Sequence, residues 1–345
     1  MIYLITYVWK STDGNHTGMA YMCDLLQQKY EGKFEVLKYY QRNAVKFCSI
    51  QRVNRFLSKL VERYEDLKIV LFLVFLLIRI KPTDKIILTE YLHPRINQQC
   101  LAKIIKKFCP ATKVYGIAHL TPTMLNILGI NNINIKEWDD NIDYFVTLGS
   151  NLSMHLQGLG VATNKIITTR HYVDMQYYNN VVKTSRTFRV IVIGNMQRNY
   201  AQLETIVKYC PNTEFIICSG RRNLSQFKKF SNVDLQGYLS ESELIKLIAK
   251  SSVSLSVMED TVGSNVIVTT MAMGLCQVVS DVGAIRDYCS GENAYFCSTT
   301  EDFIESINYL SCHSDVLLEK CRKSQDYARK YDINRFVNDL VLFKE

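Results

Sequence analysis

The chain has 345 residues, of which 48% are apolar and 21% charged, and its formal net charge is +8. This length exceeds one typical hydrophobic core, so we expect two domains, and the apolar content suits a globular enzyme. The 11 cysteines are scattered singly without a C-x-x-C pair, which argues against a disulfide framework or a zinc site. The start of the chain lacks the pattern of a signal peptide, so we expect a reduced, cytoplasmic protein.

Apolar runs in the first half of the chain alternate with helical patterns and show no hairpin signals. The expected strands are Ile2–Val8, Phe34–Tyr39, Lys85–Thr89, Lys113–Ala118 and Tyr144–Leu148, and the expected helices are Met19–Lys29, Asn97–Phe108 and Ser150–Leu159. Strands that alternate with helices in this way predict a parallel sheet.

The same rhythm restarts after the polar segment Tyr178–Thr187, where we place the domain boundary. The expected strands of the second half are Arg189–Ile193, Phe215–Cys218, Val253–Val257 and Gln277–Ser280, and the expected helices include Leu203–Tyr209 and Ile333–Phe343. A further helix is expected after Ser240, because Glu243 completes a capping box with it.

The longest apolar run, Ile69–Ile78, is too short to cross a membrane as a helix, which takes about 20 residues. We favour a buried helix or strand of the first domain. The alternative is a helix lying on an anionic membrane, because residues 29–107 hold 17 Lys and Arg against 7 Asp and Glu. Basic residues around the run are Arg52, Arg55, Lys59, Arg63, Lys68, Arg79 and Lys81, and a further basic cluster is Lys103, Lys106 and Lys107.

The stretch Val257–Tyr288 predicts a diphosphate site built on one helix. An apolar strand ends in Glu259 and Asp260, and Gly263 and Ser264 open the helix that follows. Free N–H groups in the first turn and the positive end of the helix dipole favour an anion there, and glycine allows close approach. The two acids follow a strand end, where ligands bind in open α/β sheets, although Asp is equally common as a helix cap.

This stretch resembles the donor-binding signature of retaining glycosyltransferases of family 4, written E-x7-E followed by A-M-A-x-G-x-P-V-V-x-S-D-x-G-G. The matching residues are Asn265, Val266, Met271, Ala272, Gly274, Val278, Val279, Ser280, Asp281 and Gly283. The first family Glu is displaced, which leaves Glu259 or Asp260 to serve, and Gln277 replaces the usual Pro. Thr269 stands where the family has the Glu that holds the ribose hydroxyls, and a neutral hydroxyl bonds roughly half as strongly as a carboxylate.

The resemblance implies an α/β fold of the GT-B type, with two Rossmann-like, doubly wound parallel-sheet domains facing a cleft. Residues 1–180 would bind the acceptor, residues 181–330 would bind the nucleotide sugar, and residues 331–345 would form a helix that packs back on the first domain. The implied donor-binding residues are Gly194, Asn195, Arg198, Tyr238, Leu239, Gly263, Ser264, Asn265, Val266 and Thr269. The implied catalytic residues are His119, Glu259 and Asp260, and the implied acceptor-side loop contains Gly14, His16 and Gly18.

Two further expectations have a plainer alternative. Arg198 is expected on the diphosphate, and Arg221 or Arg222 either supplies a second cation or is a solvated surface charge. His119 either faces the sugar at the end of a strand or is a structural histidine.

The implied activity is retaining transfer of a hexose from a nucleotide diphosphate sugar to a glycan or lipid-linked glycan, as in capsule or O-antigen biosynthesis. We expect no metal or other cofactor, because the chain has no D-x-D pair, and no nucleic-acid partner, because the basic region carries no such motif. A location at the inner face of the cell membrane, with peripheral contact to anionic lipid, fits the basic first half. The alternative is a non-catalytic module that binds glycan or nucleotide.

Overall fold

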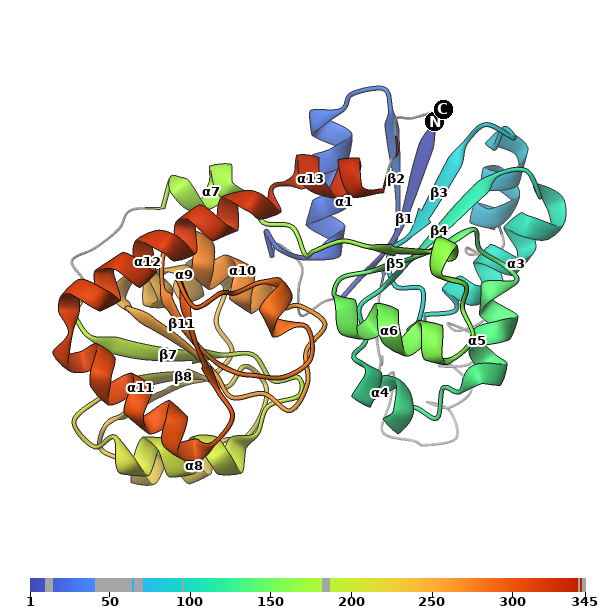
Figure 1. Cartoon of the computed structure of the whole chain (residues 1–345). Helices are drawn as coiled ribbons and strands as arrows, with labels where there is room; N and C mark the ends of the chain where they lie inside the picture. Colours follow the sequence, from blue (N-terminus) through green and yellow to red (C-terminus); the bar gives the residue numbers. More distant parts are fainter. Residues whose placement is uncertain are drawn as a thin grey trace, which may run out of the picture.

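The computed structural model describes residues 1–9, 15–40, 64, 71–94, 96–181, 187–340 and 342. These residues form two α/β domains that lie side by side, each built on one six-stranded sheet (Figure 1). Every described pairing between neighbouring strands is parallel. The α/β class and the two parallel sheets predicted from the sequence are therefore confirmed.

The first sheet has the strand order β2-β1-β3-β4-β5-β6. Its strands are β1 (Ile2–Val8), β2 (Phe34–Tyr40), β3 (Lys85–Leu88), β4 (Lys113–Ala118), β5 (Tyr144–Thr147) and β6 (Ile166–Thr168). The helices around it are α1 (Met19–Lys29), residues 71–79, α3 (Gln98–Phe108), α4 (Pro122–Ile127), α5 (Asn132–Asp139) and α6 (Ser150–Gly158), with a 3-10 turn at Thr163–Lys165.

The second sheet has the order β12-β11-β10-β7-β8-β9. Its strands are β7 (Arg189–Ile193), β8 (Glu214–Cys218), β9 (Val233–Gln236), β10 (Val253–Ser256), β11 (Cys276–Ser280) and β12 (Ala294–Cys297). The helices around it are α7 (Met175–Asn179), α8 (Tyr200–Tyr209), α9 (Glu241–Lys250), α10 (Asn265–Ala272), α11 (Thr300–Cys312) and α12 (Ser314–Ala328), with 3-10 turns at Ser225–Lys229, Ile285–Asp287 and Arg329–Tyr331.

Both sheets are buried on both faces, because successive side chains of a strand point to opposite sides. In β7, Val190 and Val192 pack in one apolar cluster while Ile191 and Ile193 pack in another. This burial on both faces agrees with the parallel sheets that the alternation of strands and helices predicts.

The chain passes from the first domain to the second just before α7. Tyr172 packs in the first core, whereas Val173, Met175 and Tyr178 pack in the second. The changeover therefore comes earlier than the expected boundary at residue 180.

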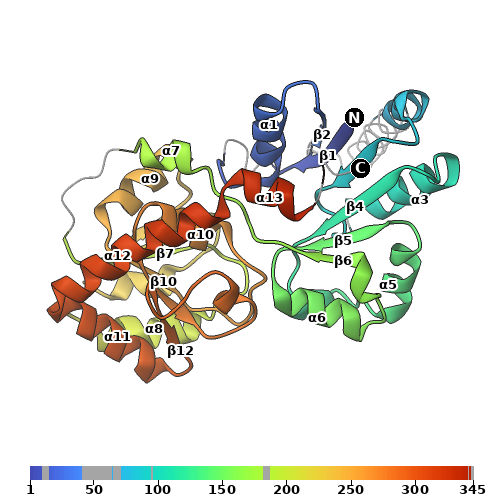
Figure 2. The same cartoon turned by 45° about the horizontal axis from the view of Figure 1, so that its top comes forward.

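The chain returns to the first domain at its end through α13 (Ile333–Asp339). Figure 2 shows this helix leaving the second domain and lying beside α1. Ile333, Phe336 and Val337 pack in the same cluster as Leu4 of β1 and Met22 of α1. The final helix thus ties the two domains together by apolar burial.

The helix over residues 71–79 divides its apolar side chains between two faces. Leu73 and Leu76 are buried in the first domain. The exposed apolar side chains are Leu71, Val74, Phe75 and Ile78. The favoured expectation for this run, a buried helix or strand, is therefore wrong for one face, and Ile69 and Val70 lie outside the described residues. Within the described parts of the chain, no helix is long and apolar enough to span a bilayer.

Candidate functional site

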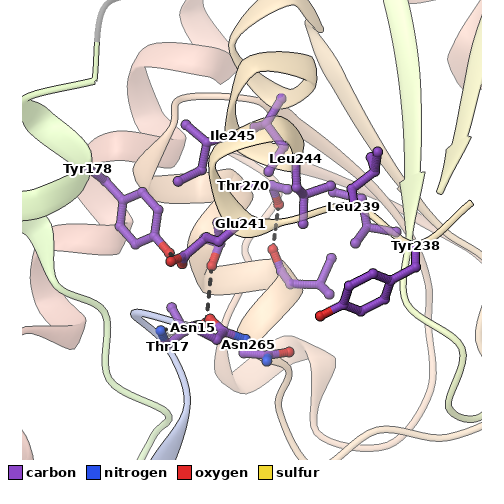
Figure 3. Close-up of a pocket in the computed structure, with 14 residues that line it drawn as sticks. Asn15, Thr17, Tyr178, Tyr238, Leu239, Glu241, Leu244, Ile245, Asn265 and Thr270 are labelled. Carbon is purple, nitrogen blue, oxygen red and sulfur yellow. Dashed lines mark hydrogen bonds between the residues drawn. The ribbon is translucent and has the colours of Figure 1, made fainter. Parts of the chain in front are cut away.

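A cleft lies where the loop before α1 meets the helices of the second domain. It encloses about 640 Å³, part of it open to solvent. The residues that line it are Asn15, Thr17, Tyr178, Ile193, Tyr238, Leu239, Glu241, Leu244, Ile245, Ile248, Asn265, Val266, Thr269 and Thr270 (Figure 3). Five of the predicted donor-binding residues are among them, namely Tyr238, Leu239, Asn265, Val266 and Thr269.

Helix α10 forms one wall of the cleft. Its N-cap, Ser264, accepts a hydrogen bond from the amide of Val266 at 3.2 Å. The other amides of the first turn point out of the helix without helical acceptors, and the dipole adds positive potential at the same end. Asn265 and Val266 therefore combine a cleft position with a helix end that favours an anion.

The conformation of Gly263, just before this helix, is fixed by the domain junction. Its φ is +109°, and an added Cβ would overlap the ring of Tyr288. The Tyr288 hydroxyl donates to the carbonyl of Leu148 at 2.5 Å and accepts from the amide of His171 at 2.7 Å. Packing against Tyr288 is thus sufficient to require glycine here, and the close approach of a diphosphate stays a prediction.

Arg198, on the loop after β7, is not one of the residues that line the cleft, but it lies across Gly194 from Val266, which is. Its Nη2 donates to the carbonyl of Ile193 at 2.9 Å, while its Nε and Nη1 are buried with no hydrogen-bond partner. Burial lowers the pKa of this guanidinium to about 10. Gly194, with φ +93°, leaves room for it: an added Cβ would lie 3.0 Å from Nη2 and 3.5 Å from Val266 of the cleft wall. A buried cation without a counter-charge is unfavourable, so this position suits an anionic ligand.

The loop that carries Arg198 is fixed against the end of β10. Arg198 and Met258 form an antiparallel bridge, and the amide of Glu259 donates to the carbonyl of Gln197 at 2.9 Å. Glu259 is exposed beside this loop. Asn195, another predicted donor residue, accepts from the Tyr200 hydroxyl at 2.9 Å.

The structure places Asp260 at the domain junction, outside the cleft. Its carboxylate accepts from the amide of Thr123 at 3.1 Å, from the side chain of Asn151 at 3.2 Å and from the amide of Thr261 at 2.8 Å. Thr123 and Asn151 belong to the first domain, so this acid joins the two domains. The sequence-based assignment of Asp260 as catalytic is not supported by any contact with the cleft residues.

His119 follows β4 and is likewise not a cleft residue. Its Nε2 lies 2.7 Å from Oε2 of the nearly buried Glu90, and its Nδ1 is buried without a partner. Burial disfavours the imidazolium, but the Glu90 carboxylate more than offsets this and raises the pKa of His119. The Glu90 carboxylate therefore stabilises the protonated form of His119.

The acceptor-side loop contacts the second domain through His16. Its amide donates to Glu241 Oε1 at 2.9 Å, and its Nδ1 lies 2.6 Å from Glu241 Oε2. The Tyr172 hydroxyl donates to the carbonyls of His16 and Gly18, both at 2.9 Å. Gly14, the third residue predicted for this loop, lies outside the described residues.

Arg221 lies over the ring of the cleft residue Tyr238, and Arg222 lies over the ring of Tyr200, which does not line the cleft. The Arg221 guanidinium is 5.2 Å from the centre of the Tyr238 ring, and that of Arg222 is 4.7 Å from the Tyr200 ring. In the described parts of the chain, no group of three His, Cys, Asp or Glu side chains is placed to hold a metal ion. The expectation of metal-independent chemistry stays a prediction.

Sequence reasoning missed nine of the cleft residues, namely Asn15, Thr17, Tyr178, Ile193, Glu241, Leu244, Ile245, Ile248 and Thr270. Thr17 lies in the loop before α1, and Tyr178 lies on α7. Both reach Thr269 on α10 only in the folded chain. For Glu241 a signal was present. It lies two residues after Leu239, and Glu243 completes the capping box with Ser240, so a second acid in that turn is available for another contact.

Comparison with known protein families finds a match for the second domain. Residues 186–313 match the family model of the group 1 glycosyl transferases. No curated protein matches the sequence. The match covers the part of the chain that holds Arg198, β10 and α10, which is therefore similar to the glycosyl transferases of this group.

Solved structures resemble the whole chain at low identity. HepE from Anabaena, determined with UDP and glucose, is 12% identical over 99% of both chains, with a TM-score of 0.67. Sucrose-phosphate synthase from Thermosynechococcus elongatus is 10% identical over 99% of this chain and 98% of its own, with a TM-score of 0.69. TarM is 16% identical over only 79% of this chain and 57% of its own, with a TM-score of 0.62. The fold is therefore that of the GT-B glycosyltransferases.

Proposed function

We propose that this protein is a retaining glycosyltransferase that moves a sugar from a nucleotide diphosphate donor to a glycan or lipid-linked glycan in surface polysaccharide biosynthesis. The glycosyltransferase domain and the GT-B fold support the reaction class. HepE was solved with UDP and glucose, which makes a uridine donor the first candidate.

The observation that carries the proposal is the guanidinium of Arg198, whose Nε and Nη1 are buried without a hydrogen-bond partner close to the cleft residue Val266. When the bond between sugar and diphosphate breaks, negative charge grows on the leaving phosphate. A pre-placed cation and the N-terminal amides of α10 stabilise that charge without rearranging. Arg198 thus supplies what the reaction needs at the position where the donor's diphosphate would lie.

The other cleft residues have roles that fit the same donor. Tyr238 and Leu239 would contact the base, and Thr269 with its neighbours would face the ribose. Glu259, exposed next to the Arg198 loop, would accept hydrogen bonds from the sugar hydroxyls. The acceptor would enter from the side of the first domain, past the loop that holds His16.

A membrane-bound acceptor is favoured by the exposed apolar face of residues 71–79. Arg79 lies at its end, with its guanidinium 4.9 Å from the centre of the Phe75 ring and bonded to the Glu35 carboxylate at 2.7 and 3.0 Å, and the exposed Lys81 follows. Apolar side chains flanked by basic ones hold a surface helix to anionic lipid. The basic residues Arg52, Arg55, Lys59, Arg63 and Lys68 lie outside the described residues.

Vesicle sedimentation tests the membrane contact. We expect a larger fraction of the wild type to sediment with phosphatidylglycerol vesicles than with phosphatidylcholine vesicles. The double variant Phe75→Ser/Ile78→Ser should sediment less with the phosphatidylglycerol vesicles. Ile133→Ser, a comparable exposed apolar residue on α5, is the control. Equal sedimentation of wild type and double variant would remove the membrane claim.

A product assay with UDP-, GDP-, ADP- and dTDP-sugars tests the proposed reaction. Release of the nucleoside diphosphate with transfer or hydrolysis of the sugar, reduced in Glu259→Ala, supports the enzyme. Binding of a nucleotide sugar without any turnover would instead identify a non-catalytic module.

A further inference from the structure

One carboxylate reaches the cleft, and the proposed chemistry leaves it without a role. Among the described residues that line the cleft, Glu241 is the only acid. It is the first residue of α9, whose capping box is completed by Glu243 with Ser240. Glu241 is therefore not needed to cap the helix, and its side chain is 20% exposed.

Glu241 and Thr269 both line the cleft, and both lie next to the side chain of Tyr178. The Tyr178 hydroxyl lies 3.4 Å from Glu241 Oε1, and the hydroxyls of Thr269 and Thr17 are 3.5 Å apart. Figure 3 shows Tyr178, Glu241 and Thr17 directed toward the same space from three different segments. The acid from α9 thus lies on the side of the cleft where α10 presents a threonine.

His16 fixes the orientation of Glu241 from the first domain. Besides its two contacts with the carboxylate, its ring stacks on Tyr177 at 3.4 Å between centroids and 7° between planes. A carboxylate offers about four acceptor positions, and the two short contacts with His16 use half of them. The contact with Tyr178 is long, so acceptor capacity remains for a ligand in the cleft.

We propose that Glu241 is a specificity-determining residue that accepts hydrogen bonds from the ribose hydroxyls of the donor. It would provide from α9 the carboxylate that α10 does not provide at Thr269, with His16 as its positioning residue. Two neighbouring hydroxyls match the two oxygens of a carboxylate, and bonds to a charged acceptor are the stronger kind. This inference rests on the proposed function, because it assumes a nucleoside diphosphate in the cleft.

Calorimetric titration of the full chain with UDP, 2′-deoxy-UDP and 3′-deoxy-UDP tests it, with GDP and its deoxy analogues in parallel. We expect the wild type to bind the ribonucleotide about tenfold to a hundredfold more tightly than at least one deoxy analogue. Glu241→Gln should reduce this preference to about threefold or less. Glu243→Gln, which removes the same charge from the same helix turn, should retain the wild-type preference.

Two results would overturn the inference while leaving the proposed function intact. The first is equal affinity of the wild type for the ribonucleotide and both deoxy analogues, a result that can be obtained without any variant. The other is an unchanged ribose preference in Glu241→Gln, or in Glu241→Asp if the first variant does not fold. Absence of binding of every nucleoside diphosphate to the wild type would overturn both proposals.

Discussion

The guanidinium of Arg198 donates a single hydrogen bond of 2.9 Å to the carbonyl of Ile193, and its Nε and Nη1 atoms are buried without partners. Such a cation destabilises the ligand-free protein, because burial removes its hydration and no carboxylate replaces it. Arg198 therefore increases the affinity for an anion and decreases the stability of the unliganded fold.

Arg198→Met should therefore separate stability from binding. We expect the free energy of unfolding to be unchanged or higher by about 1–2 kcal/mol, while affinity for UDP falls about tenfold or more. Chemical denaturation and calorimetry measure the two effects. Arg189→Met at the other end of β7 removes an exposed pair with Glu214 and should change neither by much. Lower stability with unchanged affinity would show that Arg198 has a structural role alone.

Gly263→Ala should destabilise the protein through the domain junction. The φ of +109° and the overlap with the Tyr288 ring together should cost about 2–4 kcal/mol. Gly32→Ala is the matched control, because Gly32 has φ +74° but no atom within 4 Å of an added Cβ. Urea unfolding of both variants gives their free energies of unfolding, and the difference between them measures the effect of the overlap with Tyr288. Equal losses of stability in the two variants would contradict this effect.

The core strands could be predicted because their own residues specify them. Arg189–Ile193 is apolar at four successive positions, and the structure places β7 at the same bounds. β6 could not be predicted in this way, since its three residues are partly exposed and it gains its place by pairing with β5. Local pattern thus gives the buried strands and leaves short edge strands to tertiary context.

The cleft could be predicted only where the residues share one segment. Asn265, Val266 and Thr269 lie in the first two turns of α10, so helix geometry alone brings them close together in the cleft. The contact between His16 and Glu241 joins positions 225 residues apart, and nothing local to either residue indicates it. Asp260 was expected in the site for its place after β10, but its partners on the first domain depend on how the two domains meet.

Asp260→Asn should loosen the domain junction and leave the cleft intact. Loss of the charge weakens the hydrogen bonds from Thr123 and Asn151, by about 1–2 kcal/mol in total. Amides of α4 should then exchange faster with deuterium, while UDP affinity stays the same. Asp281→Asn, which breaks a surface pair with Arg286, is the control. Lost turnover with unchanged exchange would instead support the catalytic assignment.

The pair His119–Glu90 should make stability depend on pH. Since the folded pKa of His119 is raised above the unfolded value of about 6.5, the pair stabilises the protein below that pH. This contribution disappears as the pH rises through the folded pKa. Histidine NMR titration gives the folded value directly, and Glu90→Gln should move it below 6.5, because burial alone then acts on the ring.

His171 provides an internal reference for that titration. Burial lowers the pKa of His171 to about 4, so it should stay neutral across the range in which His119 titrates. A His119 midpoint that does not move in Glu90→Gln would show that the carboxylate does not raise its pKa.

A crystal structure of the protein with UDP tests the central claim most directly. We predict diphosphate oxygens within hydrogen-bonding distance of Nε or Nη1 of Arg198 and close to the first turn of α10, with the base beside Tyr238. Nucleotide bound elsewhere on the molecule, or a diphosphate that leaves Arg198 without a partner, would contradict the account.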